Sequence, residues 1–113
     1  MAENKVIEDL IAKTQKKIAE ANLDLSGFND KLAFQVNITG RETGVFYVEV
    51  KDHQINVAPY EYNDRDALFI TNKTNFEKLL SGTLPIPLAI ATGKLKIEGD
   101  LEKAKLFGVI LKQ

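Results

Sequence analysis

Residues 84–99 read LPIPLAIATGKLKIEG, and the first eight of them carry no charge. The stretch is much shorter than the about 20 apolar residues that a membrane-spanning helix needs. Pro87 can open a short helix, where its missing N–H does no harm, and Gly93 can end it. From Lys94 to Ile97 charged and apolar side chains alternate, which predicts a strand. The apolar side chains form either the buried roof of a filled core or one wall of a cavity that holds an apolar ligand.

Helix signals flank this stretch on both sides. Before it, Thr74 and Glu77 fit a capping box, and Gly82 is a plausible C-terminal stop for the helix that they begin. After it, Asp100 is expected to cap a last helix that starts at about Leu101. The pattern therefore predicts two helices, a strand and a third helix in the C-terminal part of the chain.

The end of the chain, LFGVILKQ at 106–113, is too apolar to lie free in water. Gly108 interrupts it, and glycine costs about 1 kcal/mol relative to alanine inside a helix. We therefore expect the last helix to bend or end there. The tail is then either a terminal segment packed on the core or a hinged flap over the mouth of a cavity.

The N-terminal part is predicted to begin with an amphipathic helix over residues 2–22 and to continue as strands. Apolar residues recur at intervals of three and four in the helix, at Val6, Ile7, Leu10, Ile11, Ile18 and Ala21. Residues 23–30 are predicted to form a connector in which Leu25 and Phe28 turn inward. Strands are predicted for KLAFQVNIT (31–39), VFYVEV (45–50), QINVA (54–58) and ALFIT (67–71). Asp52 and His53 can supply the positive φ of a hairpin turn.

The predicted order is helix, four strands, two helices, strand, helix. This order favours an α+β fold with a five-stranded, mainly antiparallel sheet covered by helices. The chain has 113 residues, which suits a single domain spanning 1–113.

Composition argues against several kinds of site. The net charge of −1 gives no field that would recruit nucleic acid, and there is no cysteine for a thiolate metal site or nucleophile. The only histidine, His53, stands in a predicted turn without a second ligand, so we expect no metal, no cofactor and no catalytic centre. Glu8 and Asp9 interrupt the apolar part of the N-terminus, which excludes a secretion signal there and makes a cytoplasmic location the default.

Residues 66–107, DALFITNKTNFEKLLSGTLPIPLAIATGKLKIEGDLEKAKLF, resemble the C-terminal half of the sterol carrier protein 2 family. The likeness lies in the strand led by Asp66, the helix ending at Gly82, the short apolar helix and the GKLKIEG strand at 93–99. GVFYVEVKDHQINV at 44–57 is similar to the family's central hairpin. In the family two aromatic residues commonly precede the GKLKI strand. Here Ile90 and Ala91 take their place, which would reshape or widen a tunnel.

The resemblance implies a domain that binds lipids, such as fatty acids and acyl thioesters, in an apolar tunnel between sheet and helices. It implies these ligand-binding residues: Phe34, Val36, Phe46, Val48, Phe69, Leu80, Ile86, Leu88, Ile90, Leu95, Ile97, Phe107 and Ile110. Lys94 and Lys96 either face solvent or bind the headgroup or phosphate of the ligand.

The leading hypothesis is a non-catalytic carrier of acyl-chain lipids that makes transient contact with membranes. A module that uses the same groove to hold a partner enzyme or a second copy of itself is the alternative. A third hypothesis is an enzyme subunit that supplies a hydrophobic substrate tunnel.

Overall fold

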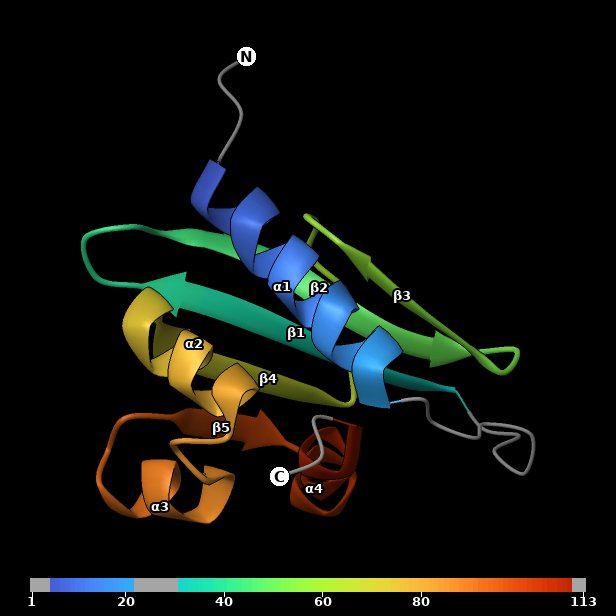
Figure 1. Ribbon diagram of the computed structural model, residues 1–113. Coiled ribbons are helices and arrows are strands. Elements are labelled where there is room, and N and C mark those ends of the chain that lie inside the picture. Colours follow the sequence, from blue (N-terminus) through green and yellow to red (C-terminus); the bar gives the residue numbers. More distant parts are fainter. Residues whose placement is uncertain (1–4, 22–30, 111–113) are drawn as a thin grey trace.

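A computed structural model describes residues 5–21 and 31–110 (Figure 1). The elements are α1 (Lys5–Ala21), β1 (Leu32–Thr39), β2 (Gly44–Lys51), β3 (Gln54–Ala58), β4 (Ala67–Asn72), α2 (Lys73–Ser81), α3 (Ile86–Ala91), β5 (Lys96–Gly99) and α4 (Leu101–Ile110). Their order and the α+β class are as predicted. The expected connector, with Leu25 and Phe28, lies outside the described residues.

The strands form one sheet in the order β3-β2-β1-β4-β5. The pairs β1–β2, β2–β3 and β4–β5 are antiparallel, whereas β1 and β4 run parallel. The sheet is therefore mainly antiparallel, as predicted, but mixed. The parallel pair has a physical cause: β4 joins the far side of β1 after the chain has left the opposite edge of the sheet, so the connection is a crossover and not a hairpin.

That crossover, residues 59–66, passes over the face of the sheet that the helices leave uncovered. The backbone N–H of Tyr62 donates to the Gln35 side chain at 2.9 Å, and the Tyr62 ring packs edge-on against Tyr47 at 5.1 Å between centroids. Burial and a hydrogen bond to Glu49 raise the pKa of Tyr62, which Lys31 above the ring partly opposes. This outer face is thus covered by a polar, hydrogen-bonded layer.

The opposite face of the sheet carries the apolar core. Figure 1 shows α1 and α2 lying across this face. Ile7 and Leu10 of α1 and Phe76 of α2 are buried there. The strands send alternate side chains into the same layer, among them Phe46, Val48 and Val50 from β2, and the buried residues form one cluster.

Helix α2 begins two residues earlier than the predicted capping box requires. Its N-cap is Asn72, whose side chain accepts a hydrogen bond from the backbone N–H of Asn75 at 2.8 Å. Glu77 is then too far along the helix to reach back to the cap, and it pairs with lysines instead. The predicted stop is confirmed, because Gly82 adopts a left-handed conformation with φ of 82° and donates to Leu79.

The predicted hairpin turn and the predicted cap of α4 are confirmed, whereas the helix end expected at Gly108 is not observed. Asp52 and His53 have the positive φ values expected of the hairpin turn, 52° and 63°, and Asp100 caps α4 by accepting from the N–H of Lys103 at 3.1 Å. The last helix does not end at Gly108, one of the two expected outcomes, because α4 continues to Ile110. A Cβ at Gly108 would lie 3.3 Å from Cδ1 of Ile86, so glycine here serves the close approach of α4 to α3.

Asp66 joins the two halves of the chain at the start of β4. Its N–H donates to the Ala33 carbonyl and its side chain accepts from the Ala33 N–H, both at 2.8 Å. Its own carbonyl accepts from the N–H of Asp100 at 2.8 Å, and Lys103 donates to its carboxylate at 3.1 Å. The residue before Asp100 is Gly99, where a Cβ would lie 2.6 Å from the Asp66 carbonyl oxygen.

We predict that Gly99→Ala strongly destabilises the protein, because the new methyl group meets backbone atoms that cannot move aside. Gly93→Ala is the matched control: its φ is also positive, at 74°, but nothing lies within 4 Å of the new Cβ. The control should lose about 1–2 kcal/mol from its backbone conformation alone. Gly99→Ala should lose about 3 kcal/mol or more. Urea unfolding followed by circular dichroism measures both, and equal losses would contradict the close approach at Asp66.

Candidate functional site

The predicted ligand-binding residues gather mainly in the layer between the sheet and the helices. Ten of them are buried members of one cluster: Phe34, Val36, Phe46, Val48, Phe69, Leu80, Ile86, Leu95, Phe107 and Ile110. Ile97 is partly buried and packs against the same cluster. Residues from β1, β2, β4, α2, α3 and α4 are thereby brought together on one face of the sheet.

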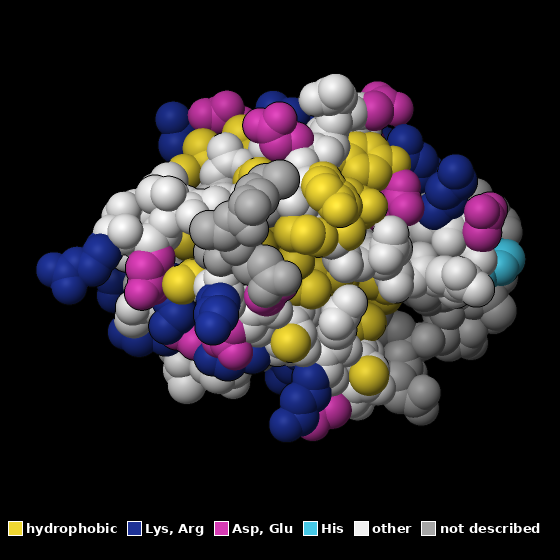
Figure 2. Space-filling model, turned by 90° about the horizontal axis from the view of Figure 1, so that it is seen from above, with side chains coloured by type: hydrophobic (Ala, Val, Ile, Leu, Met, Phe, Trp, Pro, Cys, Tyr) yellow, Lys and Arg dark blue, Asp and Glu magenta, His cyan; other side chains and the backbone are white. Residues whose placement is uncertain are grey.

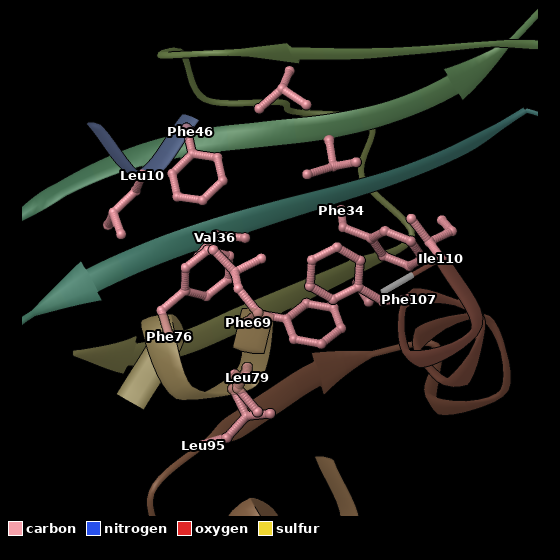
Figure 3. Packing of buried hydrophobic residues seen from close by; sticks show 14 of the residues in the cluster. Leu10, Phe34, Val36, Phe46, Phe69, Phe76, Leu79, Leu95, Phe107 and Ile110 are labelled. Atoms are coloured by element: carbon pink, nitrogen blue, oxygen red, sulfur yellow. The ribbon is translucent and has the colours of Figure 1, made fainter. Parts of the chain in front are cut away.

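Aromatic rings fill two parts of this layer, as Figure 3 shows. Phe34, Phe69 and Phe107 form a three-ring group with centroids 4.9–5.5 Å apart. Phe46 and Phe76 form a second pair, 5.4 Å apart and nearly perpendicular. Edge-on and tilted contacts at these distances are the favourable geometries for aromatic side chains. Phenyl rings therefore make up much of the interior of this layer.

Other residues of this layer were missing from the predicted set. Phe76 and Leu79 of α2 are buried in it, as are Ile7 and Leu10 of α1. Helical spacing places Ile7 and Leu10 on the apolar side of the first helix, but the resemblance assigns none of these four residues a contact with a ligand. Periodicity shows that a side chain faces inward, not which inward-facing side chain lies against a ligand.

Leu88 and Ile90 lie elsewhere. Their side chains are 51% and 46% exposed, respectively, on the outer side of α3. The inner side of the same helix holds Ile86 and Ala89, which are buried. The short apolar helix thus faces the core with one side and solvent with the other.

Charged groups near the site lie at its border. Lys13 of α1 donates to Glu77 of α2, and it also pairs with Asp9 at 3.1 Å. The hydrogen bond from Lys13 lowers the pKa of Glu77 and raises the pKa of Lys13. This pair borders a groove of about 380 Å³ between the two helices, which Lys16, Lys17, Glu20, Leu80 and Ser81 also line.

Lys94 and Lys96 are exposed, in agreement with the solvent-facing alternative, and Lys96 pairs with Glu98 at 3.2 Å. His53 is exposed in the hairpin turn, and Figure 2 shows the histidine at the surface. The same view shows positive and negative side chains interspersed, as the small net charge implies. Within 5–21 and 31–110 no group of three or more histidine, aspartate or glutamate residues could hold a metal ion. None of the described helices has both the length and the apolar character to cross a membrane.

Comparison with known proteins bears on this arrangement. The sequence profile of the SCP-2 sterol transfer family matches residues 7–112. The chain belongs to this family. Among curated proteins it is 29% identical over 80 residues to sterol carrier protein 2 of Arabidopsis thaliana, covering 67% of this chain and 65% of the plant protein. It is 29% identical over 72 residues to hydroxysteroid dehydrogenase-like protein 2 of Bos taurus, covering 63% of this chain but 17% of the bovine protein.

Solved structures of the SCP-2 family share the fold. The crystal structure of sterol carrier protein 2 like 2 from Aedes aegypti has a TM-score of 0.67 at 20% identity and covers 91% of this chain and 94% of that one. The solution structure of Aedes aegypti sterol carrier protein 2 in complex with palmitate has a TM-score of 0.64 at 18% identity, with coverages of 98% and 96%. The mixed sheet and its helical cover are thus those of SCP-2 proteins.

The ion pair between α1 and α2 predicts a pH dependence of stability. Because the folded-state pKa of Glu77 is lowered, the pair stabilises the fold above the usual glutamate pKa of about 4.3. This contribution is lost as the pH falls through the lowered value. Glu77→Gln should therefore be less stable than the unmodified protein at neutral pH, and the difference should vanish in acid.

Urea unfolding between neutral pH and about pH 3 measures this difference. Glu61→Gln, at an exposed position of the crossover, is the control and should stay close to the unmodified protein throughout. A Glu77→Gln deficit that is constant with pH would assign the effect to packing and not to charge.

Proposed function

We propose that this SCP-2 protein acts as a single, non-catalytic domain that binds and carries acyl-chain lipids, such as fatty acids or acyl thioesters. The bound chain lies between the sheet and the helices. The observation that carries the proposal is the layer of buried hydrocarbon side chains that converge there from four strands and all four described helices. The family relation and the palmitate bound to an Aedes aegypti relative of the same fold support it.

The proposed site keeps eleven of the thirteen predicted residues: Phe34, Val36, Phe46, Val48, Phe69, Leu80, Ile86, Leu95, Ile97, Phe107 and Ile110. Leu88 and Ile90 are left out because their side chains are exposed on α3. Hydrocarbon side chains can remove an acyl chain from water, but they supply no acid, base or nucleophile. This chemistry supports binding without catalysis.

Energetics favour a site that closes when it is empty. An apolar void of ~300 Å³ would cost roughly 7 kcal/mol at ~24 cal/mol per Å³, comparable to the ~5–15 kcal/mol total stability of a domain. Close contact among Phe34, Phe69 and Phe107 is therefore the expected arrangement without ligand. A lipid enters by turning these rings and moving a covering helix, and a bound sixteen-carbon chain gains at most ~13 kcal/mol from burial. Association costs of ~4–15 kcal/mol reduce this gain, so we expect micromolar affinity.

We predict that Ala89→Phe weakens the binding of a fluorescent fatty acid by about tenfold or more. Ala89 is fully buried on the inner side of α3, so a benzyl group added there occupies space that the acyl chain needs. Ala91→Phe is the matched control, two residues away on the same helix but exposed, and it should bind as the unmodified protein does.

Thermal unfolding of the lipid-free variants measures how much the added ring overpacks the closed layer, and the fatty-acid affinity decides whether the layer holds the ligand. In a filled core, the added ring overpacks and costs ~1–3 kcal/mol of stability. A large fall in Tm with unchanged fatty-acid affinity would reject the site. Native mass spectrometry of freshly purified protein gives an independent result: a bound lipid mass supports the carrier, whereas a lipid-free dimer supports the alternative of an interaction module.

A further inference from the structure

The outer side of α3 is apolar, which is unusual for a helix at the surface. Its exposed residues are Pro85 at the N-cap, Pro87, Leu88, Ile90 and Ala91, and we call this set the α3 outer face. Because Ile86 and Ala89 on the inner side are also apolar, the helix is hydrophobic all round. Such helices are normally buried or in contact with lipid. Figure 1 shows α3 at the lower edge of the molecule, with no described element beyond it.

The backbone of α3 suits an apolar environment. The first four N–H groups of a helix have no partner within the helix, but here Pro85 and Pro87 remove two of those four donors. At the other end the Thr92 N–H and hydroxyl both donate to the Leu88 carbonyl, at 3.0 and 2.8 Å, and the Lys94 N–H donates to the Ala89 carbonyl at 2.8 Å. Few backbone groups would be left without a hydrogen bond if this helix left water.

The charged residues of the segment that contains α3 are lysines, of which Lys96 pairs with Glu98 of β5. Residues 78–97 contain three lysines, Lys78, Lys94 and Lys96, and no acidic residue. Lys94 directly follows α3, is exposed, and forms no ion pair with any described residue. An apolar face bordered by lysines is complementary to an anionic bilayer surface, where lysine stems lie along the apolar region and their ammonium groups reach the headgroups.

A protein partner fits this face less well. Stable protein interfaces bury ≈ 800 Å² on each partner with ≈ 20–30 residues, far more than one short helix presents. They also form about one hydrogen bond per 100–200 Å², but the five side chains of the α3 outer face have no hydrogen-bonding group. A bilayer requires neither a large fitted area nor directional bonds.

We propose that the α3 outer face docks this protein onto anionic lipid bilayers. Leu88 and Ile90 enter the boundary between headgroups and acyl chains, and Lys94 contacts the anionic headgroups. The biological role given to this docking rests on the proposed function. The helix that contacts the bilayer also covers the lipid site with Ile86 and Ala89, so docking places the lipid site next to the membrane that supplies its ligand.

A tryptophan reporter tests the insertion, since the chain contains no tryptophan. In the Leu88→Trp variant, the emission should shift to the blue when phosphatidylcholine vesicles containing phosphatidylserine are added to the lipid-free protein. Tyr60→Trp is the matched control, because Tyr60 is another exposed large side chain but lies in the crossover. It should show no shift. No shift in Leu88→Trp, or equal shifts in both variants, would overturn the proposal.

Vesicle sedimentation tests the contributions of the side chains. Leu88→Gln/Ile90→Gln should reduce binding to phosphatidylserine-containing vesicles by about tenfold or more, without change in Tm, because both side chains are exposed. Lys94→Gln should weaken this binding by roughly fivefold, and it should have no effect with phosphatidylcholine alone. Tyr60→Gln and Lys51→Gln, also at exposed positions, are the controls. Unchanged vesicle binding by the double variant would overturn the proposal.

Two further measurements distinguish bilayer docking from a protein interface and test docking separately from the proposed function. If light scattering shows that the unmodified protein is a dimer and Leu88→Gln/Ile90→Gln a monomer, the face is a protein interface and the bilayer proposal is wrong. Binding of a fluorescent fatty acid to the unmodified protein without vesicles tests the proposed function alone. Fatty-acid binding without insertion of Leu88→Trp would refute docking only, and insertion without fatty-acid binding would refute the proposed function only.

Discussion

The parallel pairing of β1 with β4 is the constraint on which the rest of the structure depends. It joins segments about 33 residues apart, with Phe34 opposite Ala67 and Val36 opposite Phe69. Asp66 secures the start of the pair by exchanging hydrogen bonds with Ala33 through its backbone and side chain. The same residue accepts from Asp100 and Lys103, so the entry to the last helix is fixed at the same point.

The candidate site follows from this junction. Pairing β1 with β4 places Phe34 near Phe69, and the anchoring of α4 at Asp100 brings Phe107 down onto both rings. The N-terminal hairpins cannot make this layer alone, since three of its five buried phenylalanines, Phe69, Phe76 and Phe107, come from beyond the crossover. The close approach of Gly108 to Ile86 then joins α4 to α3, the helix that covers the other side of the layer.

Much of the fold could be predicted from local patterns in the sequence. Alternation identified the strands, and the turn residues Asp52, His53 and Gly82 adopted the conformations expected of them. Where two local rules competed, the outcome depended on contacts distant in sequence. The sequence favours Thr74 as the cap of α2, but Asn72 takes this role in the structure, while Glu77 pairs with Lys13, 64 residues away. Gly108 could mark a break or a close contact, and only the position of Ile86 decides between them.

The burial of the candidate site residues was predictable to a similar degree and for a similar reason. Family resemblance and periodicity together selected side chains that are mostly buried in one layer. On α3, however, both sides are apolar, so hydrophobicity cannot tell the inner side with Ile86 from the outer side with Leu88. The parallel pair could not be read from the strands themselves, because the partner of β4 depends on the path of a connection whose sequence is mainly polar.

The edge strands of the sheet affect how the protein self-associates at high concentration. Its two edge strands, β3 and β5, are only five and four residues long. Short edges, and a lysine at the start of β5, offer little backbone for another molecule to pair with. A protein with an apolar helix on its surface can self-associate through that helix. Such brief contacts would become persistent if the edge strands of the two molecules could also pair with each other. Because the sheet edges are short, contacts through α3 should remain reversible, and the fold can keep an adhesive helix without forming extended aggregates.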